Sequence, residues 1–197
     1  MSNAEITGII LSGGKGERLG GCDKGLYEYQ GAPLIQHCIE ILKPQVNSLI
    51  ISCNRNLDEY SSYGCELVSD RRVNYQGPLA GLEAALGRCQ TKYALIWPVD
   101  SQPVPANLAA TLFAELMQSK SDIVHLHQTH KPQYLVALLK SSLQPSLTDY
   151  LNSRQRTVRD WYALHRVLAI DRFQENQIRN LNTAEDFQAS SESHGGE

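Results

Sequence analysis

Short, almost wholly apolar runs alternate with stretches of helical periodicity through the first 120 residues, and this alternation strongly constrains the fold. The segment ITGIIL at residues 6–11 is such a run, as expected of a strand that is buried on both faces. In residues 33–43, by contrast, apolar side chains recur along one helical stripe that begins at a proline. Alternating strands and helices predict right-handed βαβ crossovers. The sequence therefore predicts an α/β fold, a three-layer α/β/α Rossmann-like architecture with a mostly parallel central sheet.

The other expected elements follow the same two patterns. Further strands are expected at residues 47–53, 65–69 and 93–97, and further helices at residues 79–88 and 105–118. The second part of the chain is less regular. It predicts two strands joined by a short turn (122–127 and 134–139), a helix near 143–151, a strand near 167–170 and a final short helix capped by Asn182.

Composition and charge exclude several classes of protein. The 197 residues are 42% hydrophobic and 20% charged, a balance that supports a buried core and excludes disorder for most of the chain. With 18 basic and 21 acidic residues the net charge is −3, which argues against a general nucleic-acid surface. No apolar run approaches the roughly 20 residues that span a bilayer, and the N-terminus lacks the features of a secretory signal. The sequence thus predicts no membrane partner.

The number and spacing of the cysteines indicate a reducing compartment. They are five in number, they are scattered, and none forms a C-x-x-C pair. This pattern is typical of reduced, mostly buried thiols and not of a disulfide framework or a zinc site. We therefore expect a cytoplasmic protein.

The segment LSGGKGERLGGCDKGL at residues 11–26 predicts a phosphate-binding loop. Glycines let backbone N–H groups approach an anion, and Lys15, Arg18 and Lys24 can neutralise phosphate oxygens. Ligands of open α/β sheets bind beyond the carboxyl ends of the strands, where this segment begins. A triphosphate is the expected ligand, and a flexible surface loop is the structural alternative. The P-loop motif is absent, because no Ser or Thr follows Gly14-Lys15, and the dinucleotide motif has Leu19 where its third glycine belongs.

The same segment resembles the signature of the nucleotidyltransferases, and GGCDKGL at residues 20–26 is similar in particular to the molybdenum cofactor guanylyltransferases. The resemblance continues in order along nearly the whole chain. Its further motifs are GAPL at 31–34, Asn54-Arg55, Asp70, GPLAG at 77–81, PVDSQP at 98–103 and NLNTAED at 180–186.

The resemblance implies a Mg²⁺-dependent enzyme that transfers GMP from GTP to the phosphate of molybdenum-molybdopterin and releases pyrophosphate. It also implies molybdenum cofactor insertion proteins and molybdoenzymes as partners. We interpret residues 1–188 as one domain, with a nucleotide-binding half to about residue 120 and an acceptor half at 121–188, and residues 189–197 as a disordered tail. Two alternatives remain open: a related nucleotidyltransferase that uses CTP or another phosphorylated acceptor, and a non-catalytic protein that binds nucleotide or pterin.

The resemblance implies that Arg18, Lys24 and Asp100 are the catalytic residues. Lys24 would bind phosphate, Arg18 would lie near the leaving pyrophosphate, and Asp100 would hold the metal. A single carboxylate at the end of a strand can bind Mg²⁺ together with waters and phosphate oxygens. The structural alternative for Asp100 is a loop or helix-capping aspartate.

The nucleotide site is expected to involve both backbone and side chains. Its candidate residues are Leu11, Ser12, Gly13, Gly14, Lys24, Ser52, Asp70, Gly77 and Asp100. The carboxylate of Asp70 can accept N–H groups from a guanine edge, although a ribose contact is the alternative. Ser52 stands where the family has asparagine, and its side chain is shorter. Gly77 is also explained by a tight turn that enters a helix.

Two residues are candidates for the acceptor. Asn182 matches the second asparagine of the family's N-x-N-T motif, and an N-cap is its structural alternative. Arg156 lies in a basic stretch with Arg154, Arg159 and Arg166, for which a solvated face is the alternative. The histidines between residues 125 and 130 resemble a metal cluster, but no cysteine or carboxylate follows at ligand spacing, and we assign them no metal.

Overall fold

The computed structural model describes residues 5–14, 21–72, 77–128, 131–173, 178–183 and 185–186. Within these residues seven strands form one sheet in the order β10-β8-β9-β6-β1-β4-β5. The strands are β1 (Ile6–Leu11), β4 (Ser48–Ser52), β5 (Glu66–Val68), β6 (Tyr93–Pro98), β8 (Ile123–Gln128), β9 (Lys131–Lys140) and β10 (Val167–Ile170). Residues 189–197, the expected tail, lie outside the described part of the chain.

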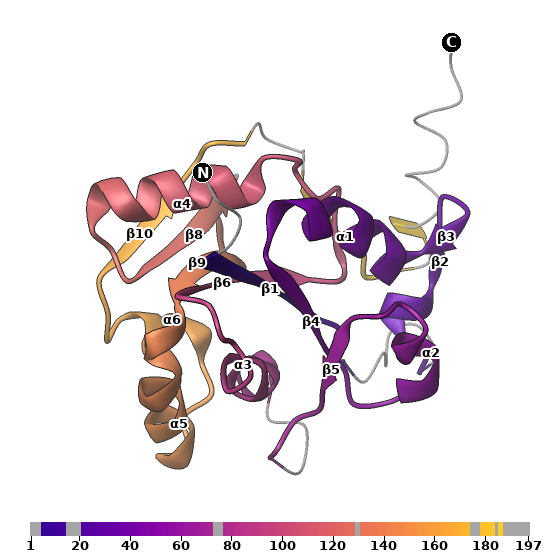
Figure 1. Cartoon of the computed structure of the whole chain (residues 1–197), viewed down its shortest axis with the longest axis horizontal. Coiled ribbons are helices and arrows are strands. Elements are labelled where there is room, and N and C mark those ends of the chain that lie inside the picture. The colour runs from indigo at the N-terminus through magenta and orange to yellow at the C-terminus, as the bar shows by residue number, and fades with distance from the viewer. Residues whose placement is uncertain are drawn as a thin grey trace.

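Helices cover both faces of this sheet (Figure 1). One face carries α1 (Leu34–Leu42) and α4 (Leu108–Ser119), and the other carries α3 (Pro78–Leu86), α5 (Gln144–Asn152) and α6 (Val158–Tyr162). The short helix α2 (Leu57–Ser61) lies beside β5. The predicted three-layer α/β/α arrangement is confirmed.

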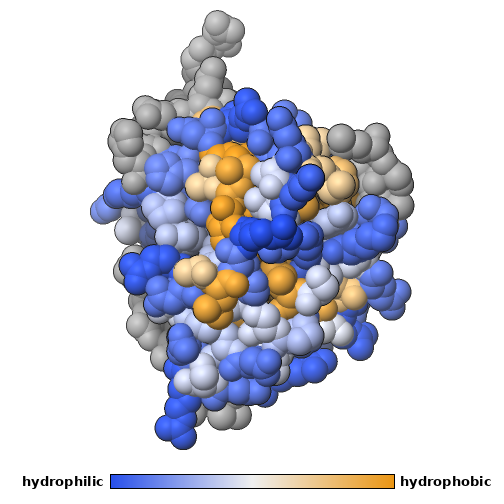
Figure 2. Space-filling view, turned by 90° about the vertical axis from the view of Figure 1, so that its left-hand side faces the viewer, coloured by the Kyte–Doolittle hydropathy of each residue, from blue (hydrophilic) through white to orange (hydrophobic). Residues whose placement is uncertain are grey.

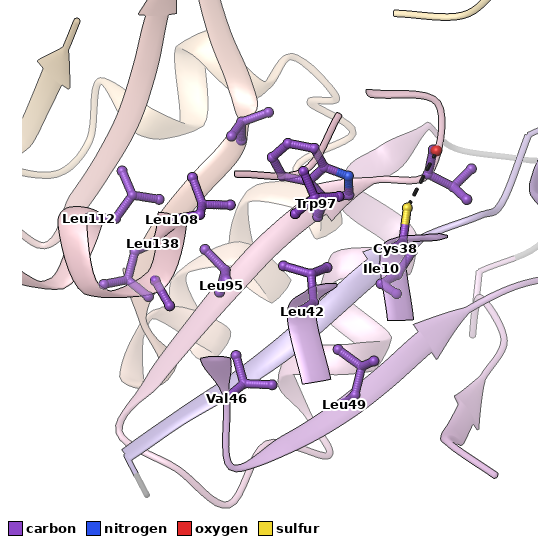
Figure 3. Packing of buried hydrophobic residues seen from close by; sticks show 14 of the residues in the cluster. Ile10, Cys38, Leu42, Val46, Leu49, Leu95, Trp97, Leu108, Leu112 and Leu138 are labelled. Atoms are coloured by element: carbon purple, nitrogen blue, oxygen red, sulfur yellow. Dashed lines mark hydrogen bonds between the residues drawn. The ribbon is translucent and has the colours of Figure 1, made fainter. Parts of the chain in front are cut away.

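Two separate clusters of buried apolar side chains hold the layers together. Successive strand residues point to opposite faces, so Ile10 joins the cluster under α1 and α4 while Ile9 joins the cluster under α3 and α5. Figure 3 shows the first cluster, in which Ile10 of β1, Leu42 of α1 and Trp97 of β6 are labelled. Ile9, Ile10, Leu42 and Trp97 are all 0% exposed. Burying an aliphatic side chain of this size contributes about 1.5–3 kcal/mol, so both faces of β1 stabilise the sheet.

The strand pairing places three carboxyl ends side by side. β1 pairs in parallel with β4 and with β6, and Leu11 lies opposite both Ser52 and Pro98. The residues that follow these strands therefore leave the sheet at one edge. The prediction of a mostly parallel sheet is confirmed, with one exception, since β9 runs antiparallel to both β6 and β8.

Several short elements carry too few residues for a periodic pattern to predict. The sequence indicated neither α2 nor α6. It also missed two small strand pairs and three 3₁₀ turns, which are β2 (Glu28–Tyr29) with β3 (Ala32–Pro33), β7 (Ser101–Gln102) with β11 (Arg179–Asn180), η3 (Lys24–Leu26), η4 (Lys43–Gln45) and η5 (Ser141–Leu143).

The side of the molecule that bears β10 is mostly hydrophilic, with apolar patches between hydrophilic side chains (Figure 2). β10 is one of the two edge strands of the sheet. In the part of the chain that the structure describes, no helix combines the length and the apolar character needed to cross a membrane.

Candidate functional site

A cavity of about 510 Å³ lies at the edge where β1, β4 and β6 end. This volume is within the range of small-molecule sites. Its lining residues are Leu11, Ser12, Gly13, Gly14, Lys24, Ser52, Asp70, Gly77, Pro78, Gly81, Pro98, Val99, Asp100, Leu135 and Asn182. Every residue that the sequence indicated for the nucleotide is in this lining, and so is the acceptor candidate Asn182.

The ammonium group of Lys24 bridges two segments that are distant in sequence. Its Nζ donates to Oδ2 of Asp100 at 2.9 Å and to Oδ1 of Asn182 at 2.7 Å. The Lys24 and Asp100 side chains are 22% and 25% exposed, so the ion pair remains open to a ligand from the cavity. A lysine held in this way can exchange its present partners for phosphate oxygens.

The small strand pair β7–β11 brings Asn182 to this position. Asn180 lies opposite Ser101, and Ser101 Oγ donates to the side-chain oxygen of Asn180 at 2.8 Å. The N–H of Leu181 donates to the carbonyl of Asp100 at 2.8 Å. These contacts hold residues 180–182 next to Asp100, the candidate metal ligand.

The expected helix cap at Asn182 is wrong. The N–H of Asp186 bonds instead to the hydroxyl of Thr183 at 3.3 Å, and the carboxylate of Asp186 accepts from the N–H groups of Asn182 and Thr183, each at 2.8 Å. This reciprocal arrangement leaves the side chain of Asn182 free to contact Lys24.

Buried hydrogen bonds hold the backbone next to Asp100. Cys38 Sγ donates to the carbonyl of Val99 at 3.7 Å (Figure 3), and Gln102 Nε2 donates to Cys38 Sγ at 3.1 Å. Burial raises the pKa of the Cys38 thiol to about 12, so it remains protonated and can donate. The backbone beside Asp100 therefore rests on a buried hydrogen-bond chain.

The oxygen donors of the site suit a divalent cation of the Mg²⁺ type. Asp100 supplies a carboxylate and Asn182 an amide oxygen, and both face the position that the Lys24 ammonium now fills. Within the described ranges no group of three or more His, Cys, Asp or Glu side chains could hold a metal ion. Mg²⁺ commonly binds one or two carboxylates and takes its other ligands from water and substrate phosphates. The residues present fit that mode of binding.

A glycine permits close packing on the other side of the cavity. A Cβ at Gly81 of α3 would collide with Ser52 Oγ and lie 3.3 Å from Asp70 Oδ1. The N–H of Asp70 donates to Asn54 Oδ1 at 2.8 Å. Burial raises the pKa of Asp70, and a hydrogen bond from Asn54 opposes that shift. Asp70 thus presents a fixed, half-buried acceptor next to Ser52.

Gly77 makes the turn into α3. Its φ of 82° lies in the left-handed region, which glycine adopts without strain, and Pro78 begins the helix. The turn expected from the sequence is therefore present, and Gly77 also lines the cavity.

Of the remaining residues that the sequence analysis discussed, Arg156 and His125 are not in this lining, and the structure does not describe Arg18. Arg156 donates to the carbonyls of Leu151 at 2.9 Å and Gln155 at 2.5 Å, and it is not among the lining residues. His125 is 4% exposed, its ring contacts Tyr134 and Tyr162, and burial lowers its pKa. His125 therefore behaves as a core side chain.

Sequence reasoning missed one buried network next to the site. Asp23, Asn56 and Tyr60 are joined by hydrogen bonds, and Tyr60 also contacts Ser12 of the cavity wall. The phosphate-loop motif includes Asp23 but gives no sign of its partners. The available signal was a tyrosine in the stretch 56–62, whose other residues are polar except for Leu57.

Comparison with known proteins identifies the relatives of this chain. Residues 8–169 match the family described as the MobA-like NTP transferase domain. A protein of Shewanella sediminis named molybdenum cofactor guanylyltransferase is 38% identical over 189 residues, which cover 95% of this chain and 96% of the relative. A protein of the same name from Bordetella petrii is 38% identical over 174 residues, with 86% and 89% coverage.

Solved structures agree in fold. Molybdopterin-guanine dinucleotide biosynthesis protein A of Archaeoglobus fulgidus superposes with a TM-score of 0.76 at 20% identity, covering 95% of this chain and 97% of that one. CTP:phosphocholine cytidylyltransferase of Streptococcus pneumoniae gives a TM-score of 0.69 at 15% identity, with 96% and 99% coverage. Proteins whose names give different nucleotides thus share this fold, so the fold alone does not select the base.

Proposed function

Because this chain belongs to the MobA-like NTP transferase family, we propose that it transfers GMP from GTP to the phosphate of molybdenum-molybdopterin and releases pyrophosphate. The observation that carries the proposal is the meeting of Lys24, Asp100 and Asn182 in a cavity beside the glycine-rich segment. Asp100 and Asn182 are 76 and 158 positions from Lys24 in the sequence, yet both accept a hydrogen bond from its ammonium group. The names of the relatives supply the base and the acceptor.

The proposed reaction needs orientation and charge neutralisation more than covalent help. An oxygen of the acceptor phosphate forms a bond to the α-phosphorus of GTP. The bond from that phosphorus to the oxygen bridging the β-phosphate breaks, and its electron pair leaves with pyrophosphate. Phosphate monoesters lose their second proton near pH 6, so the attacking group is already anionic near pH 7 and requires no strong base.

Lys24 has the main electrostatic task in this proposal. Its ammonium would leave Asp100 and Asn182 for the phosphate oxygens of GTP and balance the charge that develops on pyrophosphate. Arg18 would serve the same leaving group from the part of the loop outside the described residues. The backbone of Leu11, Ser12, Gly13 and Gly14 would line the nucleotide.

Asp100 would hold Mg²⁺ once Lys24 has turned toward the phosphates, and Asn182 would contact the same ion or the acceptor phosphate. When bound, Mg²⁺ neutralises phosphate charge and polarises the phosphorus–oxygen bonds. Asp70 would accept N–H groups from the guanine edge, with Ser52 and Gly77 at the same wall. Arg156 would contact the acceptor, in keeping with an acceptor half at 121–188.

The cellular setting is part of the same proposal. All five cysteines are free thiols, which supports a reducing compartment, the cytoplasm. The product would pass to cofactor insertion proteins and molybdoenzymes, as the family resemblance implies.

The test is an assay of GMP transfer to molybdenum-molybdopterin with labelled GTP and Mg²⁺. We expect dinucleotide formation by the unaltered protein and a loss of at least about 10³-fold in Asp100→Ala, because its metal ligand is gone. Asp160→Ala, which removes an exposed carboxylate paired with Arg159, is the matched control and should keep full activity. Substantial activity in Asp100→Ala would remove Asp100 from the site, and no transfer by the unaltered protein would refute the function.

A further inference from the structure

The hydroxyl of Tyr60 contacts two side chains of the glycine-rich segment at residues 11–26. Tyr60, in α2, is 0% exposed, and its hydroxyl is 2.6 Å from Ser12 Oγ and 2.7 Å from Asp23 Oδ1. The phenol has one proton, which it donates to the carboxylate, so the Ser12 hydroxyl must donate to Tyr60. One side chain therefore joins Ser12, near the start of the segment, to Asp23, eleven residues later.

The residue next to Asp23 is Lys24, and its backbone is fixed on both sides. Asp23 Oδ1 also accepts the N–H of Gly25 at 3.1 Å, which starts the 3₁₀ turn η3 at Lys24. A Cβ at Gly25 would collide with both Ser12 Oγ and the Tyr60 hydroxyl. The backbone on both sides of Lys24 is thus closely packed.

Two neighbours of α2, Arg55 and Asn56, contact the second carboxylate oxygen of Asp23. Asn56 Nδ2 donates to Asp23 Oδ2 at 3.0 Å, and Arg55 Nε lies 3.4 Å from that oxygen. The guanidinium of Arg55 also donates to the carbonyls of Gly21 and Cys22, each at 2.7 Å. Residues 55–60 therefore contact the three residues that precede Lys24, at both the backbone and the Asp23 side chain.

We propose that Tyr60 is a positioning residue for Lys24 and that its hydroxyl, acting through Asp23, aims the lysine ammonium into the nucleotide cavity. The proposal rests on the proposed function for the task of Lys24. Tyr60 is not among the residues that line the cavity, so it has no place at the nucleotide itself. Its effect on the reaction must pass through the segment that it joins, and an error of about 1 Å in a positioned group costs on the order of 100-fold in rate.

The first test is Tyr60→Phe, which keeps the ring and removes both hydrogen bonds. We expect kcat for GMP transfer to fall about tenfold to 100-fold, while the dissociation constant for GTP changes less than about threefold, because Lys24 acts mainly on the leaving group. Tyr63→Phe removes a phenol hydroxyl three residues further on, outside this network, and is the matched control. An unchanged kcat in folded Tyr60→Phe would overturn the proposal.

A double-mutant cycle separates positioning from general stability. In a Lys24→Met background, Tyr60→Phe should cost less than about twofold in kcat, because the group that it positions is absent. A purely structural role would lower the unfolding temperature and give the same loss of kcat with or without Lys24. Equal losses in the two backgrounds would therefore contradict the proposal.

A second variant covers the case in which Tyr60→Phe does not fold. Asn56 is exposed and has a φ of 52°, a conformation that aspartate tolerates. Asn56→Asp replaces a hydrogen bond to Asp23 by repulsion between two carboxylates, and we expect the same Lys24-dependent loss of kcat. If Asn56→Asp lowers kcat by the same factor with and without Lys24→Met, the proposal is also overturned.

A spectroscopic measurement is independent of the reaction. The ε-CH₂ NMR signal of Lys24, assigned by its absence in Lys24→Met, should shift or broaden in Tyr60→Phe and stay in place in Tyr63→Phe. If the unaltered protein does not transfer GMP, the proposed function fails and this signal alone decides whether Tyr60 positions Lys24. An unmoved signal in Tyr60→Phe would refute the positioning role.

Discussion

The Nζ atom of Lys24 lies 2.9 Å from Oδ2 of Asp100, so the carboxylate proposed to hold Mg²⁺ is paired with a cation of the protein itself. Asn182 completes the arrangement at 2.7 Å from the same ammonium. Because a lysine ammonium and a metal ion cannot occupy one position, the proposed metal role of Asp100 requires an exchange, in which the ammonium would turn to phosphate and leave the carboxylate available when GTP binds.

This exchange predicts how the free protein binds divalent cations. Without nucleotide the Lys24 ammonium competes with the metal, so Lys24→Met should bind Mn²⁺, a spectroscopic substitute for Mg²⁺, at least about tenfold more tightly than the unaltered protein. Electron paramagnetic resonance of Mn²⁺ without nucleotide measures the difference. Lys92→Met, which removes an exposed lysine paired with Glu5, is the control. Equal Mn²⁺ affinity in all three proteins would mean that Lys24 does not compete for the metal position.

The packing of α3 against β4 predicts a strict size limit at Gly81. Gly81→Ala should weaken GTP binding about tenfold or more, because its methyl group collides with Ser52 Oγ and crowds Asp70. Gly87→Ala is the matched control, since its Cβ would meet no atom closer than 3.5 Å. Calorimetric titration with GTP tests the pair. If Gly81→Ala binds GTP normally, the Ser52 side chain can move away from the added methyl group without weakening nucleotide binding.

Asp70 is predicted to discriminate between purines. A carboxylate can accept both N–H groups of the guanine edge, whereas inosine lacks the 2-amino donor. The unaltered protein should therefore prefer GTP to ITP, and Asp70→Asn should reduce that preference about tenfold or more. Competition titrations with the two nucleotides measure it. If Asp70→Asn still prefers GTP to ITP, Asp70 does not recognise the guanine edge and instead contacts the ribose or stabilises the fold.

The parts of the site that follow long strands were predictable from sequence. Apolar runs indicated the ends of β1, β4 and β6, and the glycine-rich segment, Ser52 and Asp100 had to meet where those ends meet. The fold class followed from the same alternation.

The parts that depend on short elements were not predictable. β7 and β11 have two residues each, too few for periodicity, yet their pairing places Asn182 beside Lys24. The family resemblance indicated Asn182 as an acceptor residue but not its hydrogen bond to Lys24. Likewise α2 spans only Leu57–Ser61, so nothing in its pattern indicated that Tyr60 is buried against Ser12 and Asp23. Such contacts arise from tertiary hydrogen bonds between distant segments, which local propensity does not encode.

The buried imidazole of His125 predicts a dependence of stability on pH. Burial lowers its pKa from the ordinary value of 6.5, with a further contribution from His127. Below pH 6.5 the unfolded chain binds a proton that the folded protein resists, so this contribution to stability is complete above that pH and is lost as pH falls through it.

Denaturant unfolding between pH 8 and pH 5 measures the effect. The unfolding free energy should fall toward pH 5 with a slope of up to about 1.4 kcal/mol per pH unit from this residue. His125→Phe, which suits the contacts with Tyr134 and Tyr162, should reduce that slope at some cost in absolute stability. An identical slope in the variant would show that other groups govern the pH dependence.

The proposed transfer of GMP from GTP is tested by identifying the product. The purified protein is incubated with molybdenum-molybdopterin, Mg²⁺ and, separately, GTP, CTP or ATP, and the pterin product is identified by mass together with the pyrophosphate released. The proposed function predicts a guanine dinucleotide with GTP and little product with CTP or ATP. A cytosine dinucleotide formed in preference, or no nucleotide transfer at all, would contradict it.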